Sequence, residues 1–121
     1  MPYTIERDGP HLQITFLGSI EPRDLSRVAL EAKSYEGGDV VPHRITDLSR
    51  VDKLNISFED VFQLAAARKL LRFSNTFKSA LVVSSDIQMG YARMFQTLND
   101  HPQITLRIFE SAAAARVWLD E

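Results

Sequence analysis

The chain has 121 residues, of which 45% are hydrophobic and 25% charged, which suits one folded domain and excludes a disordered chain. Its formal net charge of −2 gives no electrostatic reason to expect a nucleic-acid partner. The absence of cysteine excludes disulfides, thiol nucleophiles and zinc sites that use sulfur, and it fits the reducing cytoplasm. Neither a signal-peptide pattern nor an apolar run of about 18 residues is present, so we expect no integral membrane association. We therefore expect a cytoplasmic protein with a single domain over residues 1–121.

Two short alternating segments begin the chain. They cover Tyr3–Arg7 and His11–Leu17, and the turn-forming run Asp8-Gly9-Pro10 between them is typical of a hairpin. The stretch Pro22–Tyr35 then places apolar residues at helical spacing, with proline in the first turn. The pair Gly37-Gly38 ends this helix. The first part of the chain is therefore predicted to be a hairpin followed by a helix.

The rest of the chain alternates between patterns typical of strands and of helices. An unbroken apolar run, Ala80-Leu81-Val82-Val83, indicates a central strand. Ser57 with Asp60, and Ser85 with Gln88, have the spacing of capping boxes at helix starts. In chain order we predict a strand over His43–Leu48, a helix over Phe58–Phe73, a strand over Lys78–Ser84, a helix over Asp86–Asn99, a strand over Gln103–Phe109 and a short helix after Ser111.

This order predicts an α/β fold with a mainly parallel five-stranded sheet, an antiparallel edge strand and about four helices. Several strands alternate apolar and polar residues, which indicates that one face of the sheet carries the helices and the other meets water. We therefore predict a two-layer sandwich. The residues expected on the open face are Gln13, Thr15, Thr105 and Arg107.

One motif carries a resemblance to a known family. The run Asp47-Leu48-Ser49-Arg50-Val51-Asp52, just before the second long helix, resembles the corresponding loop of the STAS domain family, typified by bacterial anti-sigma-factor antagonists. The segments Gly90–Phe95, Ile108-Phe109 and Ala115–Leu119 are similar to its divergent SpoIIAA-like, or STAS/Sec14-like, branch of small uncharacterised bacterial proteins. The resemblance implies strand-helix units wound in one direction and a non-enzymatic regulatory role.

The chain departs from the antagonists at the position of their switch. In that family a serine shortly after the aspartate is phosphorylated by a partner kinase. Here Lys53, Leu54 and Asn55 follow Asp52, so no hydroxyl stands at that position, although Ser49 and Ser57 lie nearby in sequence. A leucine cannot carry the charge of a phosphate, and a conventional phosphorylation switch is therefore not expected.

Polar side chains cluster after two neighbouring strands of the predicted sheet. Open α/β sheets bind ligands at the carboxyl ends of their strands, so these residues form a candidate loop for a ligand or partner. Turn and helix-capping roles explain the same residue types. The candidate residues are Asp47, Ser49, Asp52, Lys53, Asn55, Ser57, Ser84, Ser85 and Asp86. Arg93 either contacts an anion or simply lies in solvent. Tyr91 falls on the apolar stripe of its helix and is expected to pack in the core.

No residue pattern favours an enzyme, a cofactor or a metal site. The three histidines lack paired metal-ligand spacing, and neither a glycine-rich phosphate loop nor a nucleophile elbow is present. A phosphorelay receiver domain would require an acidic pair after its first strand and a lysine after its last. The chain has only Glu21 near the first position and Glu110-Ser111 at the second.

The helix over Phe58–Phe73 is apolar on two sides, and one face of a sheet cannot bury both. The surplus apolar surface predicts a homodimer contact or an apolar groove, unless neighbouring helices cover it. The candidate interface residues are Phe58, Phe62, Leu64, Leu71 and Phe73. The leading hypothesis is a non-enzymatic module that binds a protein partner or itself. The alternative is a small carrier or sensor for an apolar, lipid-like or anionic metabolite near the Asp47–Ser57 loop.

Overall fold

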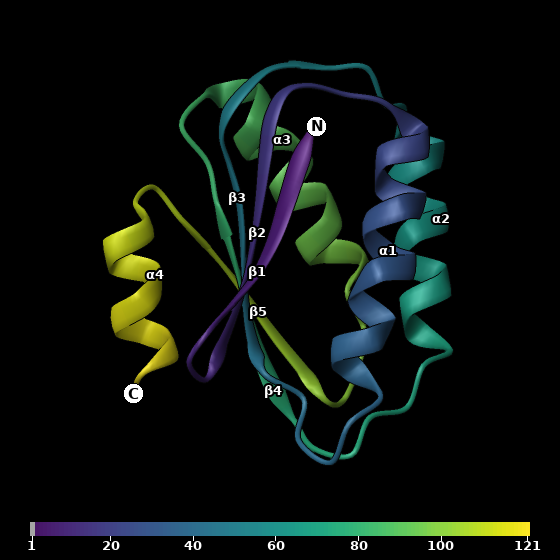
Figure 1. Cartoon of the computed structure of the whole chain (residues 1–121). Coiled ribbons are helices and arrows are strands. Elements are labelled where there is room, and N and C mark those ends of the chain that lie inside the picture. The colour runs from purple at the N-terminus through teal and green to yellow at the C-terminus, as the bar shows by residue number, and fades with distance from the viewer. Residues whose placement is uncertain (1) are drawn as a thin grey trace.

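The computed structural model describes residues 2–121, and its helices and strands follow the predicted order along the chain. Figure 1 shows their arrangement in space. In chain order the elements are β1 (Tyr3–Asp8), β2 (His11–Ile20), α1 (Pro22–Glu36), β3 (His43–Leu54), α2 (Phe58–Lys69), β4 (Phe77–Val82), α3 (Asp86–Leu98), β5 (Ile104–Phe109) and α4 (Ala112–Leu119).

The five strands form one mixed sheet in the order β1-β2-β3-β4-β5. β1 pairs with β2 in antiparallel orientation, and all other neighbours are parallel. The strand order follows the chain order because each parallel connection passes through a helix and returns to the next position in the sheet. The predicted α/β class, the antiparallel edge strand and the set of helices are confirmed.

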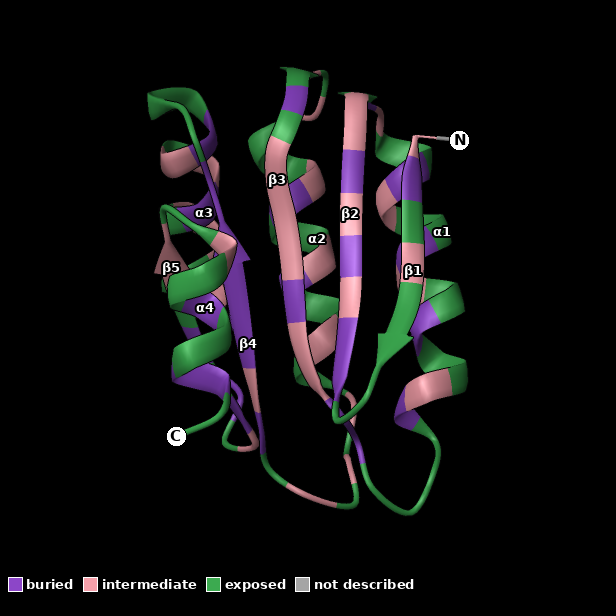
Figure 2. Cartoon of the chain, turned by 60° about the vertical axis from the view of Figure 1, so that its left-hand side comes forward, coloured by how far each residue is buried: buried purple, intermediate pink, exposed green. Residues whose placement is uncertain are grey.

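The helices divide unequally between the two faces of the sheet. α1, α2 and α3 cover one face, and α4 lies against the other (Figure 1). Trp118 of α4 packs in a cluster with Ile45, Ala80 and Val82, which face away from the three larger helices. β4 is therefore buried on both faces along most of its length, whereas β2 largely alternates between buried and half-buried residues (Figure 2).

The face that the sequence predicts to be open is thus covered in its middle by a short helix. At its margins Thr105 and Arg107 are exposed, and Gln13 and Thr15 are half-buried. Arg116 of α4 donates a 2.8 Å hydrogen bond to Gln13 Oε1. The polar residues therefore flank α4 rather than lying beneath it.

β2 and β3 are longer than the alternating pattern indicated. β3 runs to Leu54 instead of ending at Leu48, and β2 runs to Ile20. β4 pairs with β3 only as far as Asp47, so the remainder forms a two-stranded ribbon that extends beyond the sheet. Two irregularities in the ribbon shift its register, and Gly18 takes a φ of 69°, which favours glycine. Such bulges interrupt the period-two pattern and hide a strand from sequence inspection.

α2 ends earlier than predicted, at Lys69 rather than Phe73. The backbone N–H of Phe73 donates to the Gln103 side chain, whose Nε2 donates in turn to the Phe73 carbonyl. His101 Nε2 lies 2.7 Å from the Leu71 carbonyl oxygen. These contacts satisfy backbone groups of Leu71 and Phe73 from outside the helix, so α2 does not continue through this segment.

Candidate functional site

Some of the predicted loop residues gather where β3 and β4 separate. Asp47 Oδ1 accepts hydrogen bonds from the backbone N–H and hydroxyl of Ser49, and Ser84 Oγ donates to the Ser49 carbonyl. Gln88, which is buried, accepts from the Ser84 backbone N–H and donates to the Val51 carbonyl. These hydrogen bonds connect the ribbon to the start of α3. Asp47 and Ser49 are hydrogen-bonded to each other.

Gln88 therefore does not complete the predicted capping box with Ser85. Ser85 Oγ accepts from the Gln88 backbone N–H and caps α3, but the Gln88 side chain turns to Ser84 and Val51 instead. The box predicted for Ser57 and Asp60 is present at the start of α2. Ser57 thus has a capping role that occupies its hydroxyl.

A second group of candidate residues lies elsewhere on the ribbon. Asn55 Nδ2 donates to Ser19 Oγ and to Glu21 Oε1, at 3.1 and 2.9 Å. Asp52 and Lys53 are exposed between this contact and the Ser49 group. The predicted residues therefore do not form one loop, because Asp47, Ser49 and Ser84 belong to one hydrogen-bonded group and Asn55 belongs to another.

A surface pocket at the start of α3 brings the remaining candidates together. Ser84, Ser85, Asp86 and Arg93 line it, together with Glu110 from the end of β5. All five are exposed, and the two carboxylates oppose the charge of Arg93. The pocket is therefore of mixed charge and gives an anion little net attraction.

The candidate interface residues separate into surface and interior positions. Phe58 and Phe62 are 57% and 46% exposed, and their stacked rings have centroids 6.5 Å apart. Phe73 packs edge-on against Phe77, and Leu64 faces an interior cavity. Leu71 is half-buried. Of the five candidate interface residues, only Phe58 and Phe62 form exposed apolar surface on α2.

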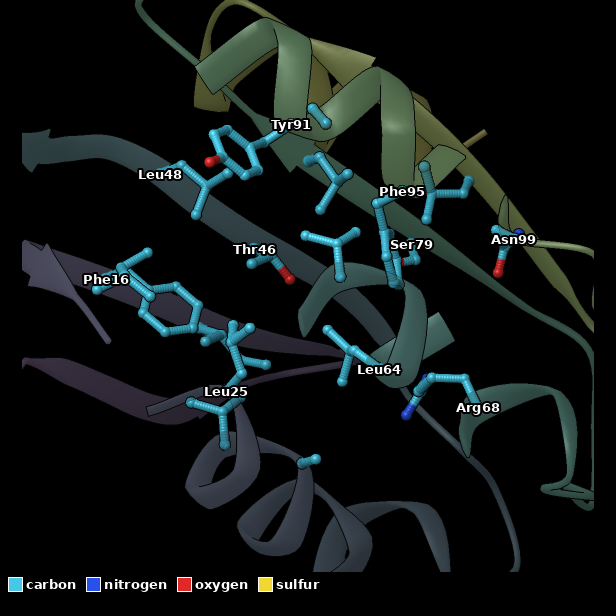
Figure 3. Close-up of a pocket in the computed structure, with 18 of the residues that line it drawn as sticks. Phe16, Leu25, Thr46, Leu48, Leu64, Arg68, Ser79, Tyr91, Phe95 and Asn99 are labelled. Carbon is cyan, nitrogen blue, oxygen red and sulfur yellow. The ribbon is translucent and has the colours of Figure 1, made fainter. Parts of the chain in front are cut away.

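The interior cavity has a volume of about 140 Å³, is partly open to solvent and lies between the sheet and α1, α2 and α3. Its walls come from all of these elements (Figure 3). Apolar residues dominate, including Phe16 of β2, Leu25 of α1, Leu64 of α2 and Phe95 of α3. Tyr91 also lines it, and its hydroxyl donates to the Ile56 carbonyl at 2.6 Å. Leu64 is the one candidate interface residue that lines the cavity, and the other wall residues are scattered along the chain.

One end of the cavity carries charge. Arg44 of β3 and Arg68 of α2 line it, and both donate to Glu36 at the end of α1. Arg68 Nη1 lies 2.9 Å from Glu36 Oε2, and each of the three side chains is at most 11% exposed. Burial, and to a smaller extent the positive charge of Arg68, lower the pKa of Arg44 to about 10. The Arg44 guanidinium therefore remains charged near neutral pH.

No helix within residues 2–121 has the length and hydrophobicity needed to cross a membrane. Over the same residues, no three histidine, aspartate or glutamate side chains cluster as a metal ion would require.

Comparison with known proteins identifies the fold. Neither a protein-family model nor a curated protein matches the sequence. The structure is similar to that of an uncharacterised DUF3478-family protein with a SpoIIAA-like fold from Shewanella loihica PV-4. The two share 18% identity with a TM-score of 0.64, over 97% of this chain and 91% of that chain. It is also similar to an anti-sigma factor antagonist from Mycobacterium paratuberculosis, with 14% identity and a TM-score of 0.65, over 98% and 93% of the two chains.

Proposed function

Because the chain has the SpoIIAA-like fold, we propose that it is a non-enzymatic regulatory module that binds a protein partner, or a second copy of itself, through α2. The observation that carries the proposal is the exposed aromatic pair Phe58 and Phe62. Large aromatic side chains are favoured at the centres of protein interfaces, where burial removes their surface from water. A stacked pair at the start of one helix offers such an anchor.

Regulation in this module does not use the phosphorylated serine of the antagonists. Leu54 is half-buried against the core cluster of β1, β2 and α1, and its neighbours Lys53 and Asn55 offer no hydroxyl. Ser57 caps α2 with its hydroxyl oxygen, and Ser49 is bonded to Asp47. Partner binding is therefore governed by the surface itself or by a bound ligand.

The proposal is tested by quantitative capture of partners on immobilised protein. Wild-type protein and a Leu30→Glu control, changed at a position of α1 that is 69% exposed, should retain the same partner. A Phe58→Glu, Phe62→Glu double variant should lose it, with an unchanged circular dichroism spectrum. Equal retention by all three proteins would contradict a partner site on α2.

The interior cavity favours a second candidate function, a small carrier or sensor for an apolar molecule. Leu48, Leu54 and Ile56, from the segment that the sequence marked as a ligand loop, contribute to its wall. Native mass spectrometry of protein purified from its own host tests this function directly. A retained small molecule of constant mass supports it, and ligand-free protein under gentle conditions opposes it.

A further inference from the structure

We infer that the interior cavity is a site for a small monocarboxylate with an apolar body, whose carboxylate lies at Arg44 and Arg68. The inference rests on the second candidate function and names the ligand class for the same site. Three observations carry it: the excess of positive charge, the size of the cavity and the separation of its polar and apolar walls.

The charge cluster is not balanced by the residues that form it. Glu36 supplies one negative charge, whereas Arg44 and Arg68 supply one positive charge each, which leaves one positive charge in excess. Arg44 Nε is buried and has no hydrogen-bond partner within residues 2–121. An uncompensated buried charge and an unused donor are both costly. A carboxylate would neutralise the charge and can accept two guanidinium hydrogen bonds.

The cavity also limits the size of the ligand. Its volume is about 140 Å³. An engineered protein cavity of about 150 Å³ lined by leucine, isoleucine and phenylalanine holds benzene. The body of the ligand is therefore an aromatic ring or a short aliphatic chain of about six carbons, and a long acyl chain would not fit.

The walls of the cavity impose an orientation on such a ligand. Arg68 and Asn99 lie at one side of the cavity, and Phe16 and Leu25 lie at the other (Figure 3). The hydroxyl-bearing Thr46 also contributes to the wall. The carboxylate would thus face Arg68 and Arg44, and its apolar body would extend toward β2 and α1.

The test is a titration followed by the methyl NMR signals of leucine and isoleucine residues. Benzoate and hexanoate serve as acid probes, with benzyl alcohol and hexanol as neutral probes of matched size. We expect both acids to shift the methyl signals of Leu64 and Leu25, with affinities at least about tenfold above those of the alcohols, as charge-assisted hydrogen bonds predict. Acids and alcohols that bind equally would overturn the inference and leave the carrier function intact. If no probe binds and native mass spectrometry finds no ligand, both the carboxylate site and the carrier function are contradicted.

Two substitutions in the charge cluster should act in opposite directions. Glu36→Gln removes the internal carboxylate that competes for the guanidiniums, so the affinity for benzoate should rise severalfold. Arg68→Gln removes half of the positive charge, and the affinity should fall at least about tenfold. A purely structural disturbance would weaken binding in both variants, and that result would overturn the inference. If Arg68→Gln does not fold, Glu36→Gln alone tests the inference: a higher affinity for benzoate supports it, and a lower affinity overturns it.

Discussion

The side chain of Gln88 donates a 2.9 Å hydrogen bond to the carbonyl oxygen of Val51 and accepts one of 2.7 Å from the backbone N–H of Ser84. Val51 lies on the ribbon formed by β2 and β3, and Ser84 follows β4. One buried amide therefore joins α3 to two strands at the point where they separate from each other. It satisfies backbone groups that strand pairing leaves free.

The first prediction concerns the strength of this junction. Gln88→Met preserves the length of the side chain but leaves the Ser84 N–H and the Val51 carbonyl without their partner. Unfolding by urea should show a loss of about 1–3 kcal/mol, the typical penalty for unsatisfied buried polar groups. Gln63→Met is the matched control, since Gln63 is exposed and bonds only to Glu59. Equal stability of the two variants would contradict the prediction.

The second prediction concerns self-association. Phe62 is 46% exposed, and we expect wild-type protein to dimerise at high micromolar concentration through the surface that contains it. Phe62→Glu should sediment as a folded monomer, because a carboxylate opposes burial of that surface. Leu30→Glu, on the exposed side of α1, should dimerise like wild type. A wild-type protein that sediments only as monomer would rule out the homodimer.

The third prediction concerns phosphorylation. Incubation with an anti-sigma-factor kinase and ATP should give no stoichiometric phosphate incorporation, because Lys53, Leu54 and Asn55, where the resemblance places the phosphorylated stretch of the antagonists, carry no hydroxyl. An authentic antagonist protein provides the positive control for kinase activity. Phosphopeptide mapping that located a phosphate on Ser49 or Ser57 would restore a switch of the usual kind.

The fourth prediction concerns His43 and pH. Burial lowers the pKa of His43 below its usual value of 6.5, and the positive charge of Lys78 acts in the same direction. Its Nδ1 accepts a 2.9 Å hydrogen bond from the Lys78 backbone N–H, which only the neutral ring can do. As the pH falls below about 6.5, the unfolded chain binds a proton before the folded chain does, so stability should decrease.

Urea midpoints measured between about pH 8 and pH 5 test this dependence. His43→Gln has no titrating group at position 43, so its urea midpoint should fall less steeply than that of wild type as the pH decreases. Subtracting the two curves removes the contribution of the carboxylates. Parallel curves would show that His43 has the same proton affinity in both states.

The order of helices and strands could be predicted because each carries its own periodicity and start signal. Ser57, Ser85 and Ser111 mark the starts of three helices at the predicted positions. The end of β3 could not be predicted, because bulges in the ribbon break the alternation on which strand prediction depends. The placement of α4 also escaped prediction, although the unbroken apolar run of β4 already required cover on both faces.

The candidate site was less predictable than the fold. Asp47 and Ser49 were identified, but their polar atoms satisfy each other, which residue type alone does not show. The cavity depends on the shape left between a sheet and three helices. Its charged end joins Glu36 of α1, Arg44 of β3 and Arg68 of α2. Tertiary structure alone brings them together.

The helices α1 and α2 are fastened to each other at both ends. Near their starts Asn55 reaches Glu21, and near their ends Arg68 reaches Glu36. The middle turns carry no such link among the described hydrogen bonds. α1 and α2 could therefore part at mid-length without breaking either link, and the hydrogen bonds of Asn55 and Arg68 would limit how far they part.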